Sequence, residues 1–457
     1  MSNKVEWGKV KNAPRNDNIR LTRPLRSHQY GLLHIAEEAP VQGRGQENGH
    51  GPQTEADGDD TVCCSRDTLD AVFSEMVIVV PCKDEELEVI RGVISQIPSP
   101  CLVILVSNSE RGGDDKYMQQ VAMVKTFRNC GRQILAIHQK DVAAAQAFGA
   151  AGMSELCDSS NGTIRNGKGE GMLLGIAIAS AFCPGRRYIG FVDADNFYPD
   201  SVNEYCKAFA AGFAMSPSPE LEDTMVRLRW ASKPKVRKGE IEFVTEGRCS
   251  RIVNSWLNKL FVPTEGNGTP GTNNCFVTTG NAGEHALTMG LALKLRMAAG
   301  YAIEPFHFVD LLERAHLSVS GGTPEKHTTG TKKHPRPLDK PVRVLQIRTA
   351  SPHFHRASDD DHIRRMWASG LGSIVHGLAP YRSMPESDDD GITKLREGIR
   401  QFAAKEGGID NATGELPRPR IYPALEDINM ARFREALESS LGKEFLKAAG
   451  YAGFAQA

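Results

Sequence analysis

Between residues 76 and 193 the chain alternates short apolar runs with longer stretches of helical character. The apolar runs lie at residues 76–80, 101–106, 133–137 and 188–193, and the helical stretches at 85–96, 115–128, 142–151 and 170–181. Strands of a parallel sheet are buried on both faces, so they read as continuous apolar runs, and parallel neighbours need a long crossover between them. The alternation therefore predicts an α/β fold with a doubly wound, mostly parallel sheet flanked by helices.

The pattern changes after residue 198. Strand-like alternation lies at residues 224–230 and 342–348, helical patterns at 248–260, 284–297 and 425–448, and loop-like composition at 41–60, 321–340 and 388–390. Changes of this kind divide a chain into regions. We expect an N-terminal extension at 1–70 with a mobile part at 41–60, an α/β half at 71–215, a mixed half of the same domain at 216–380 and a helical C-terminal region at 381–457.

Composition excludes several classes of partner. The chain has 55 Lys and Arg against 56 Asp and Glu, so its net charge of −1 predicts no broad attraction to nucleic acid or to an anionic membrane. It has no apolar run of the about 20 residues that a membrane helix needs, and its N-terminus lacks the apolar core of a secretion signal. Its ten cysteines include no Cys-x-x-Cys pair and are interpreted as reduced core thiols. We expect a cytoplasmic protein.

Two aspartates follow the last of the four apolar runs. Asp193 and Asp195 are separated by one alanine and come directly after residues 188–192. In open α/β sheets ligands bind beyond the carboxyl ends of the strands, and hard divalent cations prefer oxygen ligands and bridge to phosphates. The pair predicts an anchor for a metal ion and a diphosphate; the alternative is two aspartates that cap the following helix.

The other three strands also end in polar residues, at 83–85, 107–109 and 138–141. A carboxylate beyond the first strand can bind the hydroxyls or base of a nucleoside, although acidic residues at a helix N-terminus are the simpler explanation there. The glycine-rich stretch 165–172 places Lys168 at the start of an apolar helix, where glycines allow close approach and backbone N–H groups attract anions. It lacks the Walker A spacing, and a flexible loop with an exposed lysine is the alternative.

Positive charge is concentrated in a short part of the second half. Arg227 and Arg229 are two residues apart on an expected strand, so they share a face. The other cations of the cluster are Lys233, Lys235, Lys238, Arg248 and Arg251. Such a cluster suits a substrate that carries phosphate or carboxylate groups, and a solvated strand face is the alternative.

Two further segments are candidate ligand sites. Residues 278–285 combine small side chains with an expected helix start, which indicates either an anion pocket of backbone N–H groups or an ordinary cap. His353 and His355 point to the same side of an extended segment, so one or both can ligate a metal ion. Imidazole beside carboxylate fits Mn²⁺, Co²⁺ or Zn²⁺ better than Mg²⁺, which leaves the metal open.

Ten motifs, in this order, resemble those of the mannosyl-3-phosphoglycerate synthase family. They are VIVVPCKDE, LVSNSE, IHQKD, GKGEGM, RRYIGFVDADNFYPDSVNEY, AAGF, VRLRW, KPK, TGNAGEHAL and PHFH, and they run from about residue 76 to about residue 365. The resemblance implies a GT-A-type, Rossmann-like glycosyltransferase with a nucleotide-sugar-binding half and a mixed acceptor- and metal-binding half. It also implies GDP-mannose as donor, 3-phosphoglycerate as acceptor, retention at the anomeric carbon, and a divalent cation, with Mg²⁺ expected in the cell.

The resemblance also implies roles for individual residues. The catalytic residues would be Asp193, Asp195 and Lys168. The donor would contact Pro81, Lys83, Glu85, Ser107, Gln139, Lys140, Lys168, Asp193 and Ala194. The acceptor would contact Arg227, Arg229, Thr279, Gly280, Asn281, Ala282, Glu284 and His285. The metal ligands would be Asp195 and one of His353 and His355.

Four alternatives compete with this interpretation. The nearest is the same reaction with a nucleotide-glucose donor, and another is a nucleotide-sugar-binding protein without turnover. A sugar nucleotidyltransferase would need a glycine-rich signature after the first strand, and a haloacid-dehalogenase phosphatase would need Thr or Val soon after its first aspartate; Asn196 and Phe197 stand here instead. No Asp-x-Asp-Gly-Thr motif follows late in the chain, so we expect a synthase without a fused phosphatase. The sequence leaves a homodimer open.

Overall fold

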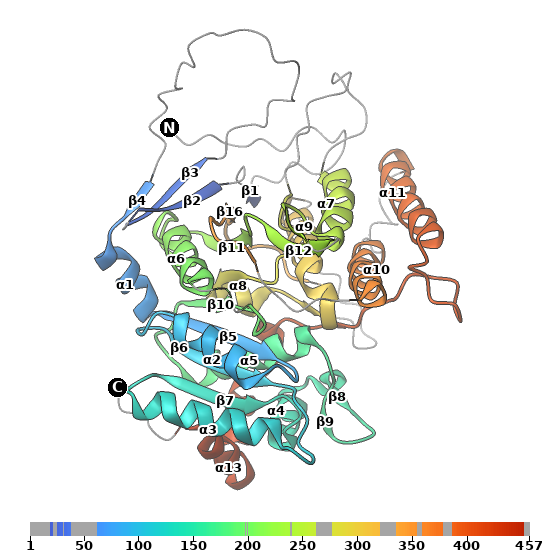
Figure 1. Ribbon diagram of the computed structural model, residues 1–457. Helices are drawn as coiled ribbons and strands as arrows, with labels where there is room; N and C mark the ends of the chain where they lie inside the picture. The colour runs from blue at the N-terminus through green and yellow to red at the C-terminus, as the bar shows by residue number, and fades with distance from the viewer. Residues whose placement is uncertain are drawn as a thin grey trace, which may run out of the picture.

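The computed structural model describes residues 19–21, 25–30, 32–37, 62–196, 198, 200–237, 240–261, 277–319, 335–353, 359–377 and 386–451. Its centre is one large sheet with the strand order β4-β3-β2-β16-β11-β14-β10-β5-β6-β7, and β1 lies beside β16 (Figure 1). The bounds are β1 Ile19–Leu21, β2 Leu25–Tyr30, β3 Leu32–Glu37, β4 Val62–Cys64, β5 Met76–Cys82, β6 Leu102–Ser107, β7 Ile134–His138, β10 Tyr188–Phe191, β11 Asp223–Arg229, β14 His285–Thr288 and β16 Val342–Arg348.

Most neighbours in the sheet are parallel. Strands β10, β5, β6 and β7 run parallel to one another, as do β11, β16 and β2, whereas β14 is antiparallel to both of its neighbours. Along β5 the side chains alternate between two apolar clusters, with Val77 and Val79 in one and Met76, Ile78 and Val80 in the other. Both faces are therefore buried, and the predicted α/β class with a mostly parallel sheet is confirmed.

Helices cover both faces of the sheet. Their bounds are α1 Arg66–Ser74, α2 Leu87–Gln96, α3 Lys116–Asn129, α4 Val142–Ala151, α5 Lys168–Phe182, α6 Ser201–Ala214, α7 Arg248–Phe261, α8 Met289–Lys294, α9 Ile303–Val319, α10 Asp360–Gly377, α11 Glu386–Lys405, α12 Met430–Glu438 and α13 Ser440–Ala449. One apolar cluster contains α1, α2, α3 and α6, and the other contains α4, α5, α9, α10, α12 and α13. Helix α4 shows how local signals set the bounds: Asp141 accepts a hydrogen bond from the N–H of Ala143, and Gly152 ends the helix in the left-handed conformation.

Three predictions for the second half are wrong. Residues 284–297 are not one helix but strand β14, helix α8 and the short strand β15 (Met297–Ala298). Residues 285–288 insert between β10 and β11 and are buried throughout, so pairing partners decided a short apolar run that periodicity cannot assign. The helix expected at 425–448 is two helices that meet at Ser439, and residues 388–390 lie in α11 instead of a loop.

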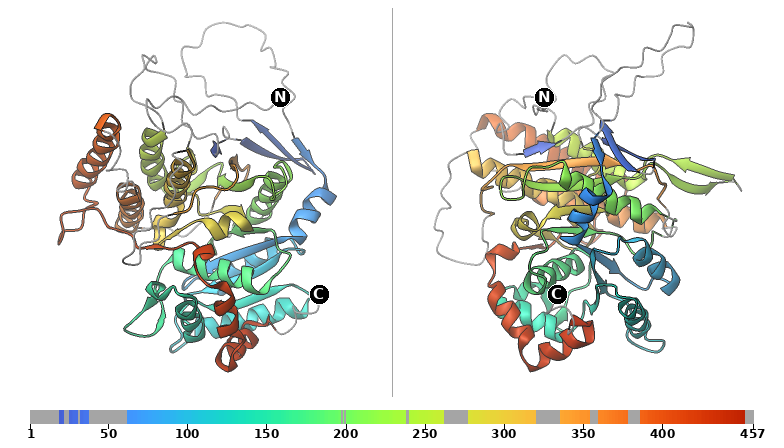
Figure 2. Two further views of the ribbon diagram at one scale, coloured as in Figure 1. Left: turned by 180° about the vertical axis from the view of Figure 1, so that it is seen from behind. Right: turned by 90° about the vertical axis from the view of Figure 1, so that its left-hand side faces the viewer.

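Segments distant in the sequence lie side by side in the structure. The N-terminal strands β1 to β4 extend the same sheet (Figure 1). Helix α12 contacts α4 and α5. The hairpin of β12 (Lys233–Arg237) and β13 (Glu240–Val244) projects from the body, at the right of the right-hand view in Figure 2. The segment 41–60 and most of 321–340, for which loops are predicted, lie outside the described residues. No helix in the described part of the chain is long and apolar enough to cross a membrane.

Candidate active site

A cleft of about 1010 Å³ opens at the carboxyl ends of β5, β6, β7 and β10. Segments that follow these four strands supply its floor, and the segment before β14 joins them because β14 runs in the opposite direction. The segment after β16 contributes as well, and helices α7, α9 and α10 form the remaining wall. The polar strand ends in the sequence therefore converge, as expected for a sheet whose parallel strands end at one edge.

Lys168 lines this cleft as the first residue of α5. Its Nζ is 2.6 Å from Oδ1 of Asp193 and 2.9 Å from Oε1 of Glu304, and its side chain is 14 % exposed. Burial alone would lower the pKa of Lys168, but the attraction of Asp193 and Glu304 overcomes it and raises that pKa well above the ordinary value. The ammonium group is thus held charged and in one place.

Two further carboxylates stand beside this ion pair. Burial, reinforced by the charge of Asp193, raises the pKa of Asp195 to about 6 and that of Glu284 to about 8. Oε1 of Glu284 is buried without a hydrogen-bond partner among the described residues. Gly283 lets the chain approach this closely, since a Cβ there would collide with Oδ2 of Asp193. The cluster has more acidic groups than Lys168 can neutralise.

His353 closes the same part of the cleft. It lies after β16, stacks on Trp230 with ring planes 10° apart, and has its Nδ1 3.3 Å from the hydroxyl of Tyr205 and 3.8 Å from Oε1 of Glu284. Burial, with a smaller effect of the charge on Lys233, lowers the pKa of His353 to about 3, so the imidazole is neutral. His355, the other predicted metal ligand, lies outside the described residues.

These residues fit a divalent cation. Within the part of the chain that the structure describes, no three His, Cys, Asp or Glu side chains could hold a metal ion by themselves. Asp195, Glu284 and His353 nevertheless all line the cleft, and they provide carboxylate oxygens and a neutral imidazole. A bound cation would compensate the surplus negative charge and give the orphaned oxygen of Glu284 a partner.

The predicted donor residues divide into two groups. Pro81, Lys83, Glu85, Gln139, Lys168, Asp193 and Ala194 line the cleft. Ser107 is fully buried, with its hydroxyl accepting from the N–H of Ser109, and Lys140 is exposed outside the cleft lining. Gln139 holds the glycine-rich turn in place, because its Nε2 donates to the carbonyls of Arg165 and Gly167.

Arg227 is not positioned to bind an acceptor. It is fully buried, and its Nε and Nη2 donate to the carbonyls of Thr279 and Glu304 at 2.9 and 3.1 Å. Its guanidinium also lies over the ring of Phe308, and burial lowers its pKa to about 9. Arg227 therefore joins two segments of the site from below, and the expectation that it faces a substrate with Arg229 is corrected.

The 278–285 segment leads into strand β14 and not into a helix, so the helix N-terminus expected there does not exist. Arg229, Thr279, Asn281 and Ala282 line a small hollow of about 20 Å³ next to the cleft, and Asn281 and Glu284 line the cleft itself. Gly280 packs on helix α7, where a Cβ would be 2.5 Å from Cδ1 of Leu257. His285 is fully buried and its Nδ1 bonds the carbonyl of Gly283.

Sequence reasoning missed two residues that the fold brings to the cleft. Glu304, near the start of α9, supplies the second carboxylate on Lys168, and Tyr301, just before α9, is 37 % exposed in the cleft lining. Neither residue follows one of the four apolar runs of the first half or belongs to a recognisable motif. Their spacing of three residues next to an apolar helix is the one local signal, and it is common to many helix starts.

The family model and two curated relatives point to the same family. The model of a family described as mannosyl-3-phosphoglycerate synthase (osmo_MPGsynth) matches residues 23–437. The mannosyl-3-phosphoglycerate synthase of Pyrococcus furiosus is 37 % identical over 82 % of this chain and 87 % of its own length, and that of Aeropyrum pernix is 33 % identical over 67 % and 74 %. Among solved structures, the glucosyl-3-phosphoglycerate synthase of Mycobacterium tuberculosis, in complex with Mn²⁺, UDP and phosphoglyceric acid, is 17 % identical with a TM-score of 0.41, over 70 % of this chain and 83 % of that chain.

Proposed function

The chain belongs to the mannosyl-3-phosphoglycerate synthase family, and from this premise we propose that it transfers mannose from GDP-mannose to the 2-hydroxyl of 3-phosphoglycerate. The products are mannosyl-3-phosphoglycerate and GDP, and the anomeric configuration of the mannose is retained. The observation that carries the proposal is Lys168, fixed between Asp193 and Glu304 at the carboxyl edge of a nucleotide-binding type of sheet. That is where a departing diphosphate needs positive charge.

The donor would lie along the floor of the cleft. Its guanosine would lie against the turn after β5, where Pro81, Lys83 and Glu85 line the cleft. Its diphosphate would reach Lys168 and the N–H groups at the start of α5, which carry the partial positive charge of the helix N-terminus. The mannose would then lie near Asp193, between the diphosphate and the second half.

The acceptor would lie against the segment before β14. Asn281 and Glu284 face the cleft there, and Arg229 lines the adjoining hollow. Local backbone and side-chain donors in this segment would orient the phosphate and carboxylate of 3-phosphoglycerate, and orientation of this kind supplies a large share of the rate. Arg227 would act indirectly, since it holds Thr279 in place through the backbone.

Asp195 and His353 would hold the divalent cation, with Glu284 beside them. When bound, the cation supplies a Lewis acid that neutralises charge on the diphosphate. In the transfer, the bond between mannose C1 and the phosphate oxygen breaks and a bond from C1 to the acceptor's O2 forms on the same face. The proton of the 2-hydroxyl passes to the departing phosphate oxygen, so the step needs no enzymic base. Lys168 keeps its proton and stabilises the GDP oxygen by charge.

The test is GDP release from GDP-mannose with Mg²⁺ or Mn²⁺, with and without 3-phosphoglycerate, and with GDP-glucose in parallel. We expect release that requires acceptor and metal and that favours mannose. Equal rates with GDP-glucose would remove the donor assignment and leave the reaction class. Tight binding of GDP-mannose without release from either donor would identify a binding protein and contradict the proposal.

A further inference from the structure

Glu170 is a buried carboxylate that the proposed reaction does not use. It lies two residues after Lys168 on α5 and is 2 % exposed. Its Oε1 accepts a hydrogen bond of 2.8 Å from the hydroxyl of Tyr422, and its Oε2 accepts one of 3.0 Å from the N–H of Gly300. Tyr422 comes 252 residues later in the chain, in the short strand β17 (Ile421–Tyr422).

Each partner belongs to a segment that matters for the cleft. Gly300 comes directly before Tyr301, which lines the cleft, and four residues before Glu304, which pairs with Lys168. Strand β17 pairs with β15, and Met297 lies opposite Tyr422. The carboxylate thus joins the helix that carries the catalytic lysine, the segment that carries its second counter-ion, and the C-terminal region.

The packing around Glu170 leaves little room for these segments to move. A Cβ on Gly167, the residue before Lys168, would collide with Oε2 of Glu170, and a Cβ on Gly169 would collide with the carbonyl oxygen of Ala298. The turn before Lys168 therefore lies directly against the Glu170 carboxylate. A change in the position of that carboxylate would be transmitted to the lysine.

Ion pairing does not explain why the carboxylate of Glu170 is buried. No cationic side chain of the described residues makes an ion pair with Glu170, and burial raises its pKa in spite of the hydrogen bonds it accepts. A buried carboxyl group is costly unless hydrogen bonds replace its water. Tyr422 and Gly300 supply those bonds, so the loss of either leaves a buried oxygen unsatisfied.

We propose that Glu170 and Tyr422 are positioning residues for Lys168, so that the C-terminal region sets where the ammonium group stands relative to Asp193 and Glu304. The inference rests on the proposed function, in which Lys168 faces the departing diphosphate. Outer partners of this kind orient the groups that touch substrate, and their loss typically reduces activity or affinity about 10- to 100-fold. A displacement of about 1 Å is enough for such a loss.

The chain offers a matched control. The hydroxyl of Tyr451 donates to the carbonyl of Phe182 at 3.1 Å, so it too joins the C-terminal region to α5, but at the opposite end of the helix from Lys168. Tyr422→Phe and Tyr451→Phe each remove one hydroxyl and one hydrogen bond to the same helix. Both variants would be compared with the full-length wild type by thermal unfolding, steady-state kinetics and calorimetric titration with GDP in the presence of Mg²⁺.

We expect Tyr422→Phe to lower kcat about 10- to 100-fold and to weaken GDP binding, with KM for 3-phosphoglycerate unchanged. Tyr451→Phe should keep the kcat and GDP affinity of the wild type. Glu170→Gln keeps the shape of the side chain, and its kcat and GDP affinity should lie between those of the two tyrosine variants. Equal losses of kcat in both tyrosine variants would reduce Tyr422 to a structural role, and an unaltered kcat in Tyr422→Phe would overturn the proposal.

The titration separates this proposal from the proposed function. A wild type that releases no GDP from GDP-mannose would contradict the proposed function, yet the GDP affinities of the two variants would still test the positioning of Lys168. Weaker GDP binding in Tyr422→Phe alone would then support it, and unchanged GDP binding would overturn it.

Discussion

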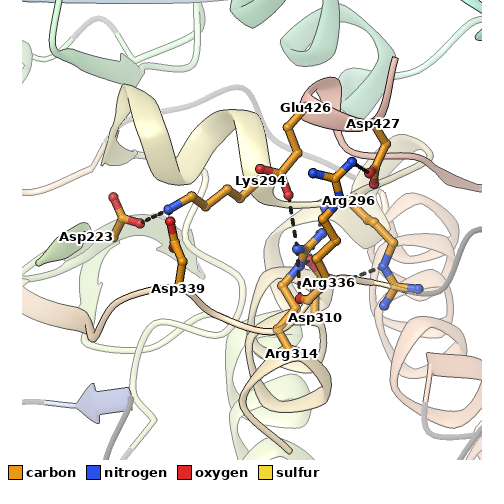
Figure 3. A network of polar contacts seen from close by, with 9 residues as sticks. All are labelled: Asp223, Lys294, Arg296, Asp310, Arg314, Arg336, Asp339, Glu426 and Asp427. Atoms are coloured by element: carbon orange, nitrogen blue, oxygen red, sulfur yellow. Dashed lines mark hydrogen bonds and ion pairs between the residues drawn. The ribbon is translucent and has the colours of Figure 1, made fainter. Parts of the chain in front are cut away.

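Two buried clusters of charged residues in this molecule differ in how their carboxylates are compensated. In the cluster of Figure 3, Asp310 accepts from Nε of Arg296 at 2.5 Å and from Nε of Arg314 at 2.9 Å, and Asp223 faces Lys294 at 2.9 Å. Asp223 also faces Lys340, which is not among the residues drawn there, at 3.3 Å. Each of these two carboxylates has two cationic partners. In the cleft, by contrast, one cation serves two carboxylates.

There, Lys168 alone pairs with Asp193 and Glu304, and Asp195 makes no ion pair within the described residues. The pKa values of the carboxylates are therefore shifted in opposite directions in the two clusters. Arg296 and Arg314 lower the pKa of Asp310 in spite of its burial, whereas burial and the charge of Asp193 raise the pKa of Asp195 to about 6. A cluster built for stability compensates its charges internally, and one built for a ligand leaves a deficit that the ligand fills.

The same substitution in the two clusters should have opposite effects. Asp195→Asn should reduce kcat roughly a thousandfold, because several kcal/mol of charge stabilisation on the diphosphate are lost with the metal anchor. It should not lower the melting temperature, since it removes a like charge beside Asp193. Steady-state kinetics in saturating Mg²⁺ or Mn²⁺ and thermal unfolding measure the two effects. Wild-type turnover in this variant would remove the metal-anchor role of Asp195.

Asp310→Asn should instead lower the free energy of unfolding by about 3 kcal/mol, because it removes the fully buried counter-ion that Arg296 and Arg314 share and leaves them only Glu313 and Glu426. Its kcat at low temperature should stay near that of the wild type, because Asp310 does not line the cleft. The folded-state pKa of Asp310 is lowered, so its contribution is present above the ordinary carboxyl range and is lost as pH falls toward the lowered value. Urea unfolding between pH 3 and 7 should show that the free energy of unfolding falls less on acidification in the variant than in the wild type. An equal dependence on pH in the two proteins would contradict this account.

The two lysines give a second matched pair. Lys168 and Lys294 each face two carboxylates, and their side chains are 14 % and 15 % exposed. Lys168→Met should lower kcat roughly a hundredfold, since a fixed charge facing the diphosphate is worth about 3 kcal/mol. Lys294→Met should lower stability and leave kcat unchanged. If both variants lose activity to the same extent, the distinction between the two clusters fails.

The charge deficit also predicts how stability depends on pH without metal. The folded-state pKa values of Asp195 and Glu284 are raised to about 6 and about 8, so between the ordinary carboxyl range and these values the folded state binds more protons than the unfolded state. Below about pH 6.5 this effect is opposed by His285, His307 and His353, whose pKa values are lowered by burial, because only the unfolded state binds their protons. Above that pH Glu284 still titrates, so stability should fall as pH rises from about 7 to about 8, by up to about 1.4 kcal/mol per pH unit.

A bound cation should reverse that trend, because it replaces the protons and stabilises the folded state by mass action. Melting curves from about pH 7 to about pH 8.5 in EDTA and in Mn²⁺ measure the effect, and Glu284→Gln provides the control, since it should flatten the EDTA curve over this range. A melting temperature in EDTA that rises over this range would contradict the predicted surplus of negative charge.

The first half was more predictable than the second for a reason visible in its strands. In β5, β6, β7 and β10 the local signals agree, because each has an apolar run with polar residues at its end and a helix after it. The helices that follow β6 and β7 also begin at a side-chain cap, Asp115 of α3 and Asp141 of α4. Residues 285–288 give no such signal, because a four-residue apolar run suits a helix as well as a strand. They form a strand because they pair with β10 on one side and with β11 on the other.

The candidate site also has a part that the sequence predicts and a part that it does not. The sequence by itself placed Asp193, Asp195 and Lys168 together, because parallel strands end at one edge of a sheet and a glycine-rich helix start next to that edge attracts anions. It also indicated the family, through ten motifs in order. These are properties of neighbouring residues and of their order along the chain.

Only the tertiary structure decided which charges are compensated. It buried Arg227 under the site, brought Glu304 to Lys168, and set Tyr422 against Glu170 from the far end of the chain. Burial and the distance between charges determine both the pKa of a group and its role, and neither is a property of a residue or its neighbours in sequence. The sequence therefore determined the kind of chemistry, and the packing of distant segments determined which side chains take part in it.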